Sequence, residues 1–241
     1  MLTSLPFEEY RRLRPQLERV HLALEQVLYQ PGETIGHVYF PIDAVVSLLT
    51  VMANGAAVET GMVGREGMVG LPVFLDGSLD QSAAGSGRSR HGARGDSRAV
   101  CQVEGDAWRL AADALVAEVG RQGHLPALLL RYTQSALCQV AQAAACNGLH
   151  PVEARCARWL LMVGDRVGDH HFPMTQRFLA EMLGVRRASV VEVMGTLTRA
   201  GLIAHDYGHV TIVDRAGLEA AACECYRVLK LELDGEALRR A

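Results

Sequence analysis

The spacing of apolar and polar residues changes character several times along this chain. Near the start, apolar side chains recur every three or four positions between residues 6 and 19, which predicts a short amphipathic helix. From Ala23 to Ala111 the apolar residues instead form short runs, separated by turn signals such as Pro31-Gly32 and Asn54-Gly55. This pattern predicts about eight short strands arranged as a jelly roll or β-roll.

One segment interrupts the strand pattern. Residues 80–96, DQSAAGSGRSRHGARGD, contain four glycines and three arginines but no aliphatic side chain larger than alanine. Such a segment has too little apolar surface to fill a core. We predict a flexible, solvated loop between two strands, with a ligand-binding or partner-binding arm as the alternative.

Beyond Ala111 the apolar spacing becomes helical. No glycine or proline occurs between Ala127 and Asn147, so a single helix of more than twenty residues is predicted. Its length and its many alanines favour a dimer interface, although the same stripe could simply cover the β-roll. The residues predicted to form the interface are Leu125, Leu129, Tyr132, Leu137, Val140 and Ala144.

A domain boundary is predicted where this long helix stops. We expect Gly148 to end the helix and Pro151 to open the next one. The fold class is therefore α+β, with an N-terminal β-roll domain at residues 1–120, a dimerisation helix at 121–149 and a C-terminal domain at 150–241.

The C-terminal domain carries the most specific pattern in the sequence. Thr175 is a good N-cap for a helix at 176–183, and Gly184 supplies a tight corner before a second helix at 186–200. Two short strands follow, joined by a turn that contains Gly208. Helix, glycine corner, helix and hairpin in this order predict a winged helix-turn-helix that binds double-stranded DNA.

Candidate DNA contacts follow from this prediction, because the second helix of such a motif enters the major groove. Each of them could instead be an ordinary solvated residue on a helix surface. The candidates for reading bases are Arg186, Arg187, Ser189, Val190 and Glu192, although Val190 also falls on the apolar face of its helix. The candidates for contacting phosphates are Thr175, Gln176, Arg177, Arg199 and His209.

Composition narrows the class of protein only slightly. The formal net charge is −3 and neither half is strongly basic, so charge alone does not indicate nucleic-acid binding. No apolar run approaches the roughly 18 residues of a membrane span, and the first residues lack the apolar centre of a signal peptide. We expect a cytoplasmic protein with no membrane partner and with six reduced cysteines.

Taken together, these segments resemble the Crp/Fnr family of bacterial transcription regulators over nearly the whole chain. The matching segments are Pro31–Glu33, Val38–Phe40, Val45–Leu49, Gly64–Gly70, Phe74–Gly77 and Leu179–Leu202. The resemblance implies a cyclic-nucleotide-binding-like β-roll and a homodimer on a near-palindromic operator, with half-sites roughly 34 Å apart. It also implies RNA polymerase as a partner and no enzymatic activity.

The residues that bind cyclic AMP in this family are altered here. Members that bind it carry a Gly-Glu pair and an Arg-Ser or Arg-Thr pair, whereas Gly70 is followed by Leu71 and Arg98 by Ala99. A ribose hydroxyl would lose its charged partner, so we expect no cyclic AMP and leave the effector unassigned. The alternative is a small-ligand or cyclic-nucleotide receptor with a pocket rebuilt around Gly70, Arg98 and Ala99.

No metal centre or cofactor is predicted from spacing. The iron-sulfur branch of the family has N-terminal cysteines, and this chain has none before Cys101. The Cys-x-Cys pair, Cys223 and Cys225, falls in a stretch expected to be helical, where residues two apart point in different directions, so redox sensing there is only a hypothesis. A cupin-like metal enzyme is disfavoured, because the predicted strands contain only His37. The histidines considered as ligands and found in no recognised spacing are His21, His37, His124 and His150.

Overall fold

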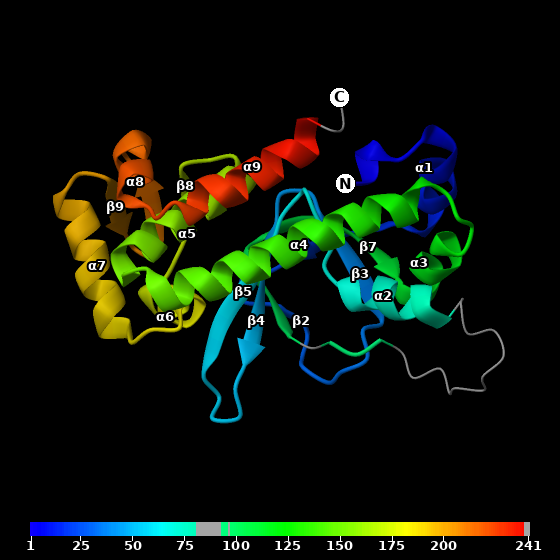
Figure 1. Cartoon of the computed structure of the whole chain (residues 1–241), viewed down its shortest axis with the longest axis horizontal. Helices are drawn as coiled ribbons and strands as arrows, with labels where there is room; N and C mark the ends of the chain where they lie inside the picture. The colour runs from blue at the N-terminus through cyan, green and yellow to red at the C-terminus, as the bar shows by residue number, and fades with distance from the viewer. Residues whose placement is uncertain (81–92, 96, 239–241) are drawn as a thin grey trace. The chain divides into compact units, whose positions relative to one another are not determined.

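The computed structural model describes residues 1–80, 93–95 and 97–238 (Figure 1). The strands are β1 (Glu18–Leu22), β2 (Val27–Tyr29), β3 (His37–Pro41), β4 (Val45–Val51), β5 (Ala57–Val63), β6 (Arg98–Val103), β7 (Gly105–Ala111), β8 (His171–Pro173), β9 (Ile203–Asp206) and β10 (His209–Ile212). The α-helices are α1 (Phe7–Leu13), α2 (Leu71–Asp80), α3 (Ala112–Val119), α4 (His124–Leu149), α5 (Val152–Val167), α6 (Gln176–Leu183), α7 (Arg187–Arg199), α8 (Arg215–Ala221) and α9 (Cys225–Leu238). Short 3-10 turns occupy Leu2–Ser4 and Arg14–Gln16.

The chain forms two compact units. The first comprises Met1–Leu48 and Val63–Ala136, and the second comprises Leu49–Met62 and Leu137–Ala241. The second unit is therefore built from two separate stretches of sequence. The α+β class is confirmed, whereas the predicted boundaries at residues 120 and 149 stay a prediction.

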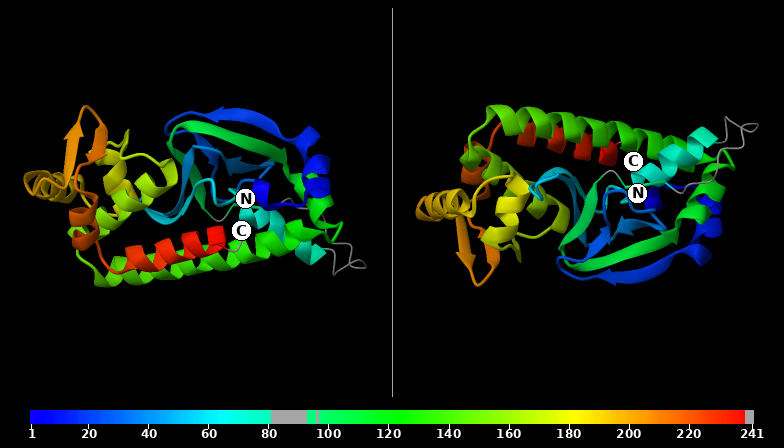
Figure 2. Two further views of the ribbon diagram at one scale, coloured as in Figure 1. Left: turned by 90° about the horizontal axis from the view of Figure 1, so that it is seen from above. Right: turned by 90° about the horizontal axis from the view of Figure 1, so that it is seen from below.

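Strands β1 to β7 form two sheets, with the orders β1-β7-β3 and β2-β6-β4-β5. Both neighbours of β7 run antiparallel to it. Figure 2 shows these strands curling round one another as a roll. Alternate residues such as Val38, Phe40 and Leu110 are buried and fill the inside of the roll, as expected when one face of each strand meets the core.

Two local predictions for the first unit are wrong. The helix predicted at residues 6–19 ends at Leu13, and β1 already begins at Glu18. Pro15, in the 3-10 turn between them, has no N–H to continue an α-helix. In addition, α2 lies inside the region predicted to be all strands, because a short apolar run such as LPVFL is ambiguous between strand and helix.

The predicted loop at residues 80–96 lies mostly outside the described residues. Its described part, Ala93–Gly95, pairs with the turn that follows β2. The Ile35 amide donates to the Ala93 carbonyl at 2.9 Å, and the Gly32 amide donates to the Gly95 carbonyl at 2.8 Å. Ala93 and Gly95 are thus held by backbone hydrogen bonds.

The predicted helix of more than twenty residues is confirmed: α4 runs from His124 to Leu149, one residue beyond the Gly148 predicted to end it. Glu9 caps its first turn: the carboxylate accepts from the His124 amide at 2.8 Å and from the Leu125 amide at 3.1 Å. A Cβ on Gly123 would lie 2.7 Å from the Glu9 carboxyl carbon, so the close approach requires glycine there. Burial alone would raise the pKa of Glu9, but the hydrogen bonds from His124 and Leu125 outweigh it and leave the pKa below its ordinary value.

The core of the second unit forms around α5, whose Trp159 is almost fully buried. The stretch Leu49–Met62 belongs to this unit: the Trp159 indole N–H donates to Glu59 at 2.9 Å, and Arg166 donates to the Met62 carbonyl at 3.3 Å. None of the helices in the described ranges is both long and apolar enough to cross a membrane.

Candidate nucleic-acid interface

The first helix of the predicted motif, α6, has both ends specified locally. The Thr175 hydroxyl accepts a hydrogen bond from the Phe178 amide at 3.2 Å, which caps the N-terminus. Gly184 ends the helix in a left-handed conformation, with φ of 63°. A Cβ there would lie 3.1 Å from Val58, so both backbone conformation and space favour glycine at this corner. The corner is confirmed as predicted.

The second helix, α7, buries one face and leaves the other exposed. The buried residues are Val190, Val193, Met194 and Leu197. Val190 is 0% exposed, so its side chain belongs to the helix-pair core and cannot reach a base from this surface. Its inclusion among the DNA contacts is wrong for that reason. The opposite face presents Ala188, Glu192 and Arg199, all exposed.

Positive charge gathers at the start of α7. Arg186 is the N-cap residue and Arg187 the first helical residue, and both are exposed. Within the described part of the chain, neither guanidinium makes a hydrogen bond or an ion pair, so all their N–H donors are available to a ligand. Arg199, near the other end, donates to the Thr196 hydroxyl at 3.1 Å.

The hairpin beside these helices is a two-residue turn between β9 and β10, with His209 paired to Asp206. Tyr207 and Gly208 have φ of 44° and 81°, the two positive values of a type I′ turn. Tyr207 is 95% exposed at the tip. The Gly208 carbonyl accepts from the Met174 amide at 2.7 Å, which holds the turn next to the start of α6.

Two features of this sheet were not predicted. β8 adds a third strand and gives the order β8-β10-β9. His171 on β8 and His209 on β10 stack with ring centroids 5.0 Å apart. Thus His209 lies on the outer surface of the hairpin sheet, while Thr175 and Arg177 are exposed at the start of α6 and Gln176 is half-buried there.

Several solved structures share this arrangement of a β-roll, a long helix and a winged helix-turn-helix. FixK2 from Bradyrhizobium japonicum is 14% identical, with a TM-score of 0.67 over 86% of this chain and 98% of its own. A CRP-family transcriptional regulator from Thermus thermophilus, TTHB099, is 20% identical, with a TM-score of 0.64 over 84% and 96%. The c-di-GMP-responsive regulator CLP of Xanthomonas campestris is 14% identical, with a TM-score of 0.64 over 86% and 99%. At these identities the likeness shows the fold.

The sequence also matches a protein-family model over part of its length. A family model described as the Crp-like helix-turn-helix domain matches residues 154–221, which cover α5 through α8. The chain thus has the fold of these regulators and contains a segment similar to the Crp-like helix-turn-helix domain. No curated protein matches it by sequence.

The long helix α4 does not present the predicted interface residues on one face. Leu125, Leu129 and Tyr132 are buried in the core of the N-terminal unit, so they are unavailable to a second copy. The later three, Leu137, Val140 and Ala144, are exposed. The first half of the predicted set is therefore wrong, and the second half stays a prediction.

The three residues assigned to a rebuilt ligand pocket come from two places in the chain, Gly70 before α2 and the neighbours Arg98 and Ala99 in β6. Gly70 precedes α2 with φ of 99°, and Arg98 is the first residue of β6. Ala99 is fully buried and pairs with Tyr29 of β2, so its side chain offers nothing to a ligand. A small-ligand pocket at these positions stays a prediction.

Two exposed side chains beside the predicted DNA contacts were not among the candidates from the sequence. Val191 on α7 and Tyr207 on the hairpin are exposed apolar or aromatic side chains beside the predicted contacts. For Val191 the signal was present, because helical spacing places it away from the buried positions Val190 and Val193. Tyr207 gave no such signal, since a bulky residue at a positive φ is uncommon.

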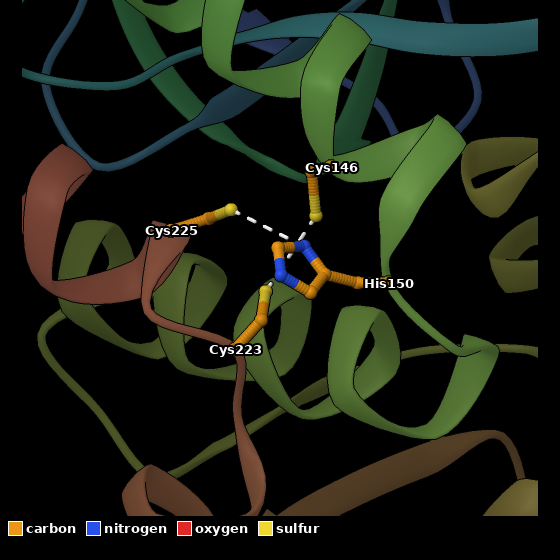
Figure 3. A group of neighbouring side chains, drawn as sticks. All are labelled: Cys146, His150, Cys223 and Cys225. Atoms are coloured by element: carbon orange, nitrogen blue, oxygen red, sulfur yellow. Dashed lines mark hydrogen bonds between the residues drawn. The ribbon is translucent and has the colours of Figure 1, made fainter.

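A second group was missed because its members lie far apart in the sequence. Cys146 and His150 at the end of α4 lie beside Cys223 and Cys225, and their ligand atoms are all within 4.8 Å of one another (Figure 3). The stretch predicted to be one helix breaks between α8 and α9, which lets both cysteines face α4. A hydrogen bond with Cys223 lowers the pKa of Cys146 to about 4, and the charge of Arg158 acts in the same direction.

Proposed function

We propose that this regulator is a homodimer that binds a near-palindromic operator, with α7 of each copy in a major groove. The observation that carries the proposal is the pair Arg186 and Arg187, exposed and without side-chain partners in the described residues, at the start of the second helix of a Crp-like helix-turn-helix. The first turn of this helix is the part that meets base edges in such motifs.

Each outward side chain has a chemical role in this proposal. Arg187 can donate two hydrogen bonds to guanine O6 and N7, and Glu192 can accept one from cytosine N4. Val191 can contact a thymine methyl group. The residues proposed to contact phosphates are Thr175, Gln176, Arg177, Arg199 and His209, and those proposed at the base edges with Arg187 are Arg186, Ser189 and Glu192.

The proposed dimer interface is a heptad stripe on α4. Exposed residues follow a strict three-four spacing from Ala127 to Gly148, the pattern of the a and d positions of a coiled coil. Leu130 and Leu137 are its large members, with 59% and 61% of their surface exposed. The stripe consists of Ala127, Leu130, Gln134, Leu137, Ala141, Ala144 and Gly148.

Two copies joined along this stripe would present two α7 helices to one side of the DNA, with half-sites roughly 34 Å apart. A regulator bound in this way acts on transcription through RNA polymerase, either by contacting it or by blocking its access. The direction of regulation follows from the position of the operator relative to the promoter.

Selection of bound sequences from a random pool of double-stranded DNA tests the proposal with the full chain. We expect a near-palindrome to be enriched. Arg187→Ala should relax the preference at one base position per half-site and cost about 1–3 kcal/mol for the lost contact. Arg199→Ala should weaken binding to all sequences alike and reduce the salt dependence by about one phosphate contact.

Arg11→Ala serves as the control, because Arg11 is an exposed arginine on α1 of the N-terminal unit. It should leave both the selected sequence and the salt dependence unchanged. Failure of the wild-type chain to enrich any motif would contradict the proposal, as would an unaltered motif after Arg187→Ala.

A further inference from the structure

The end of α4 and the break between α8 and α9 bring four potential metal ligands together. The Cys146 and Cys223 sulfur atoms lie 3.5 Å apart, and the Cys225 sulfur lies 3.6 Å from His150 Nδ1. Figure 3 shows the three thiols and the imidazole pointing toward a common centre. The three cysteines are buried and His150 is partly exposed, so the group is enclosed rather than displayed on the surface.

We propose that Cys146, His150, Cys223 and Cys225 bind one Zn²⁺ ion in a tetrahedral structural site. Zinc bonds of about 2.3 Å to sulfur and about 2.0–2.1 Å to nitrogen imply tetrahedral edges of about 3.8 Å between sulfurs and about 3.6 Å between sulfur and nitrogen. The observed sulfur-sulfur and sulfur-nitrogen distances of 3.5 and 3.6 Å are close to these edges.

The four ligand atoms lie close enough together to bind a single metal ion rather than a metal cluster. All four ligand atoms lie within 4.8 Å of one another. An iron-sulfur cluster would hold its ligands further apart, because its own iron and sulfide atoms lie between them. Three thiolates and one imidazole are among the usual ligand sets of structural zinc, and they leave no open position for a substrate.

The ring of His150 is already oriented as a ligand. Its Nε2 lies 3.2 Å from the Glu224 carboxylate, which can accept a hydrogen bond from the ring N–H. With the proton on Nε2, the lone pair is on Nδ1, the atom that faces Cys225. A carboxylate behind a metal-binding histidine is the usual arrangement around zinc. Gln142 adds a donor at 2.9 Å to the Cys225 sulfur.

The surrounding charge also fits a metal thiolate centre. Three thiolates and one Zn²⁺ carry a net charge of −1. Arg155 and Arg158 on α5 are buried, and no carboxylate pairs with either of them in the part of the chain that the structure describes. Buried arginines need a compensating negative charge, and the thiolate group beside them supplies it.

The second half of the site is anchored independently of the metal. Tyr226, next to Cys225, donates to Asp165 at 2.8 Å and accepts from Arg215 at 2.6 Å. The Cys223 amide donates to the Ala154 carbonyl of α5. Both contacts hold this part of the chain to α5 before a metal arrives. Zinc binding would displace the thiol protons and fix the start of α9 to the end of α4.

Metal analysis of the full chain, purified without oxygen, tests the proposal. We expect about one Zn²⁺ per chain by mass spectrometry of the elements. Replacement by Co²⁺ should give the strong visible absorption of tetrahedral cobalt and a thiolate charge-transfer band, both lost on adding Zn²⁺. Because this titration uses the wild-type chain, it tests the proposal even if a variant fails to fold.

Variants assign the ligands. Cys223→Ser and Cys225→Ser should lose the metal, whereas Cys138→Ser, on the same helix α4 but outside the group, should keep it. Glu224→Gln keeps all four ligands and should weaken zinc affinity about 10–100-fold. Zinc far below one per chain, a Cys146–Cys223 disulfide in place of the metal, or iron with acid-labile sulfide would each overturn the proposal.

Discussion

Val190 and Val191 are neighbours in α7 whose side chains have opposite surroundings. Val190 is fully buried, packed with Val193 and Met194 in the same helix face, while Val191 is 47% exposed. One residue therefore stabilises the helix pair and the other is free to contact a partner. Substitutions at these two neighbouring valines should therefore distinguish a contribution to folding stability from a contribution to binding.

Substituting each valine by alanine should give opposite results. Val190→Ala removes two buried methyl groups and should lower the free energy of unfolding by about 2 kcal/mol. Val191→Ala should change it by less than about 0.5 kcal/mol but weaken binding to the selected operator. Urea unfolding and DNA titration measure the two effects. Equal stability of both variants would refute the assignment of Val190 to the core.

Residues whose structure depends on near neighbours were predictable from the sequence. The Thr175 cap and the Gly184 corner each depend on contacts or conformations within a few residues, and both are confirmed. The Cys146–Cys223 proximity depends instead on how α4 and α9 pack, and no local pattern reports it. Spacing rules detect metal sites only when the ligands follow one another closely in the chain.

At the scale of elements, α4 shows what periodicity reveals and what it does not. An apolar stripe at Leu125, Leu129 and Leu137 predicts that these positions are covered. The stripe does not show whether a second copy or the same chain covers these positions. In the structure, Leu125 and Leu129 are buried in the core of the same chain. The third, Leu137, is exposed and lies with Leu130 on a neighbouring face of the helix.

The predicted helix through Cys223 and Cys225 failed for a related reason. No glycine or proline occurs between Leu218 and Asp234, so the sequence there favours a continuous helix. The Cys223 amide instead bonds to Ala154 of α5, a tertiary contact that replaces the helical hydrogen bond. Strand β8 was also not predicted, because it is defined by its pairing with β10 rather than by a local sequence pattern.

The cap of α4 gives a pH-dependent prediction. Because the pKa of Glu9 is lowered in the folded chain, its ionised form contributes stability above the ordinary value of 4.5, and this contribution is lost as the pH falls through the lower folded-state pKa. Glu9→Gln should therefore lower the free energy of unfolding by about 1 kcal/mol at neutral pH and by less near pH 3. Urea unfolding across this range measures the difference.

Glu8→Gln provides the matched control for the cap. Glu8 precedes Glu9 in α1, but it is exposed and pairs only with Arg11 on the surface. Its substitution should change stability by less than about 0.5 kcal/mol throughout the pH range. A pH-independent cost of Glu9→Gln would argue that packing, rather than charge, holds the start of α4.

At the scale of the whole molecule, the heptad stripe predicts the oligomeric state. Leu137→Glu places a charge at the centre of the proposed coiled coil and should convert the dimer to a monomer in sedimentation experiments. Leu24→Glu introduces the same charge at another exposed leucine, outside α4, and should leave the mass unchanged. A dimer that survives Leu137→Glu would place the interface elsewhere.

The second unit consists of two separate stretches of sequence, and this limits where the chain can be cut into fragments. A fragment cut at Pro151 would carry every residue of the helix-turn-helix but would lose Leu49–Met62. The Trp159 indole would then lack Glu59, Arg166 would lack the Met62 carbonyl, and the Gly184 corner would lack Val58. Grafting the DNA-binding half onto another protein would therefore need the Leu49–Met62 segment as well as the C-terminal residues.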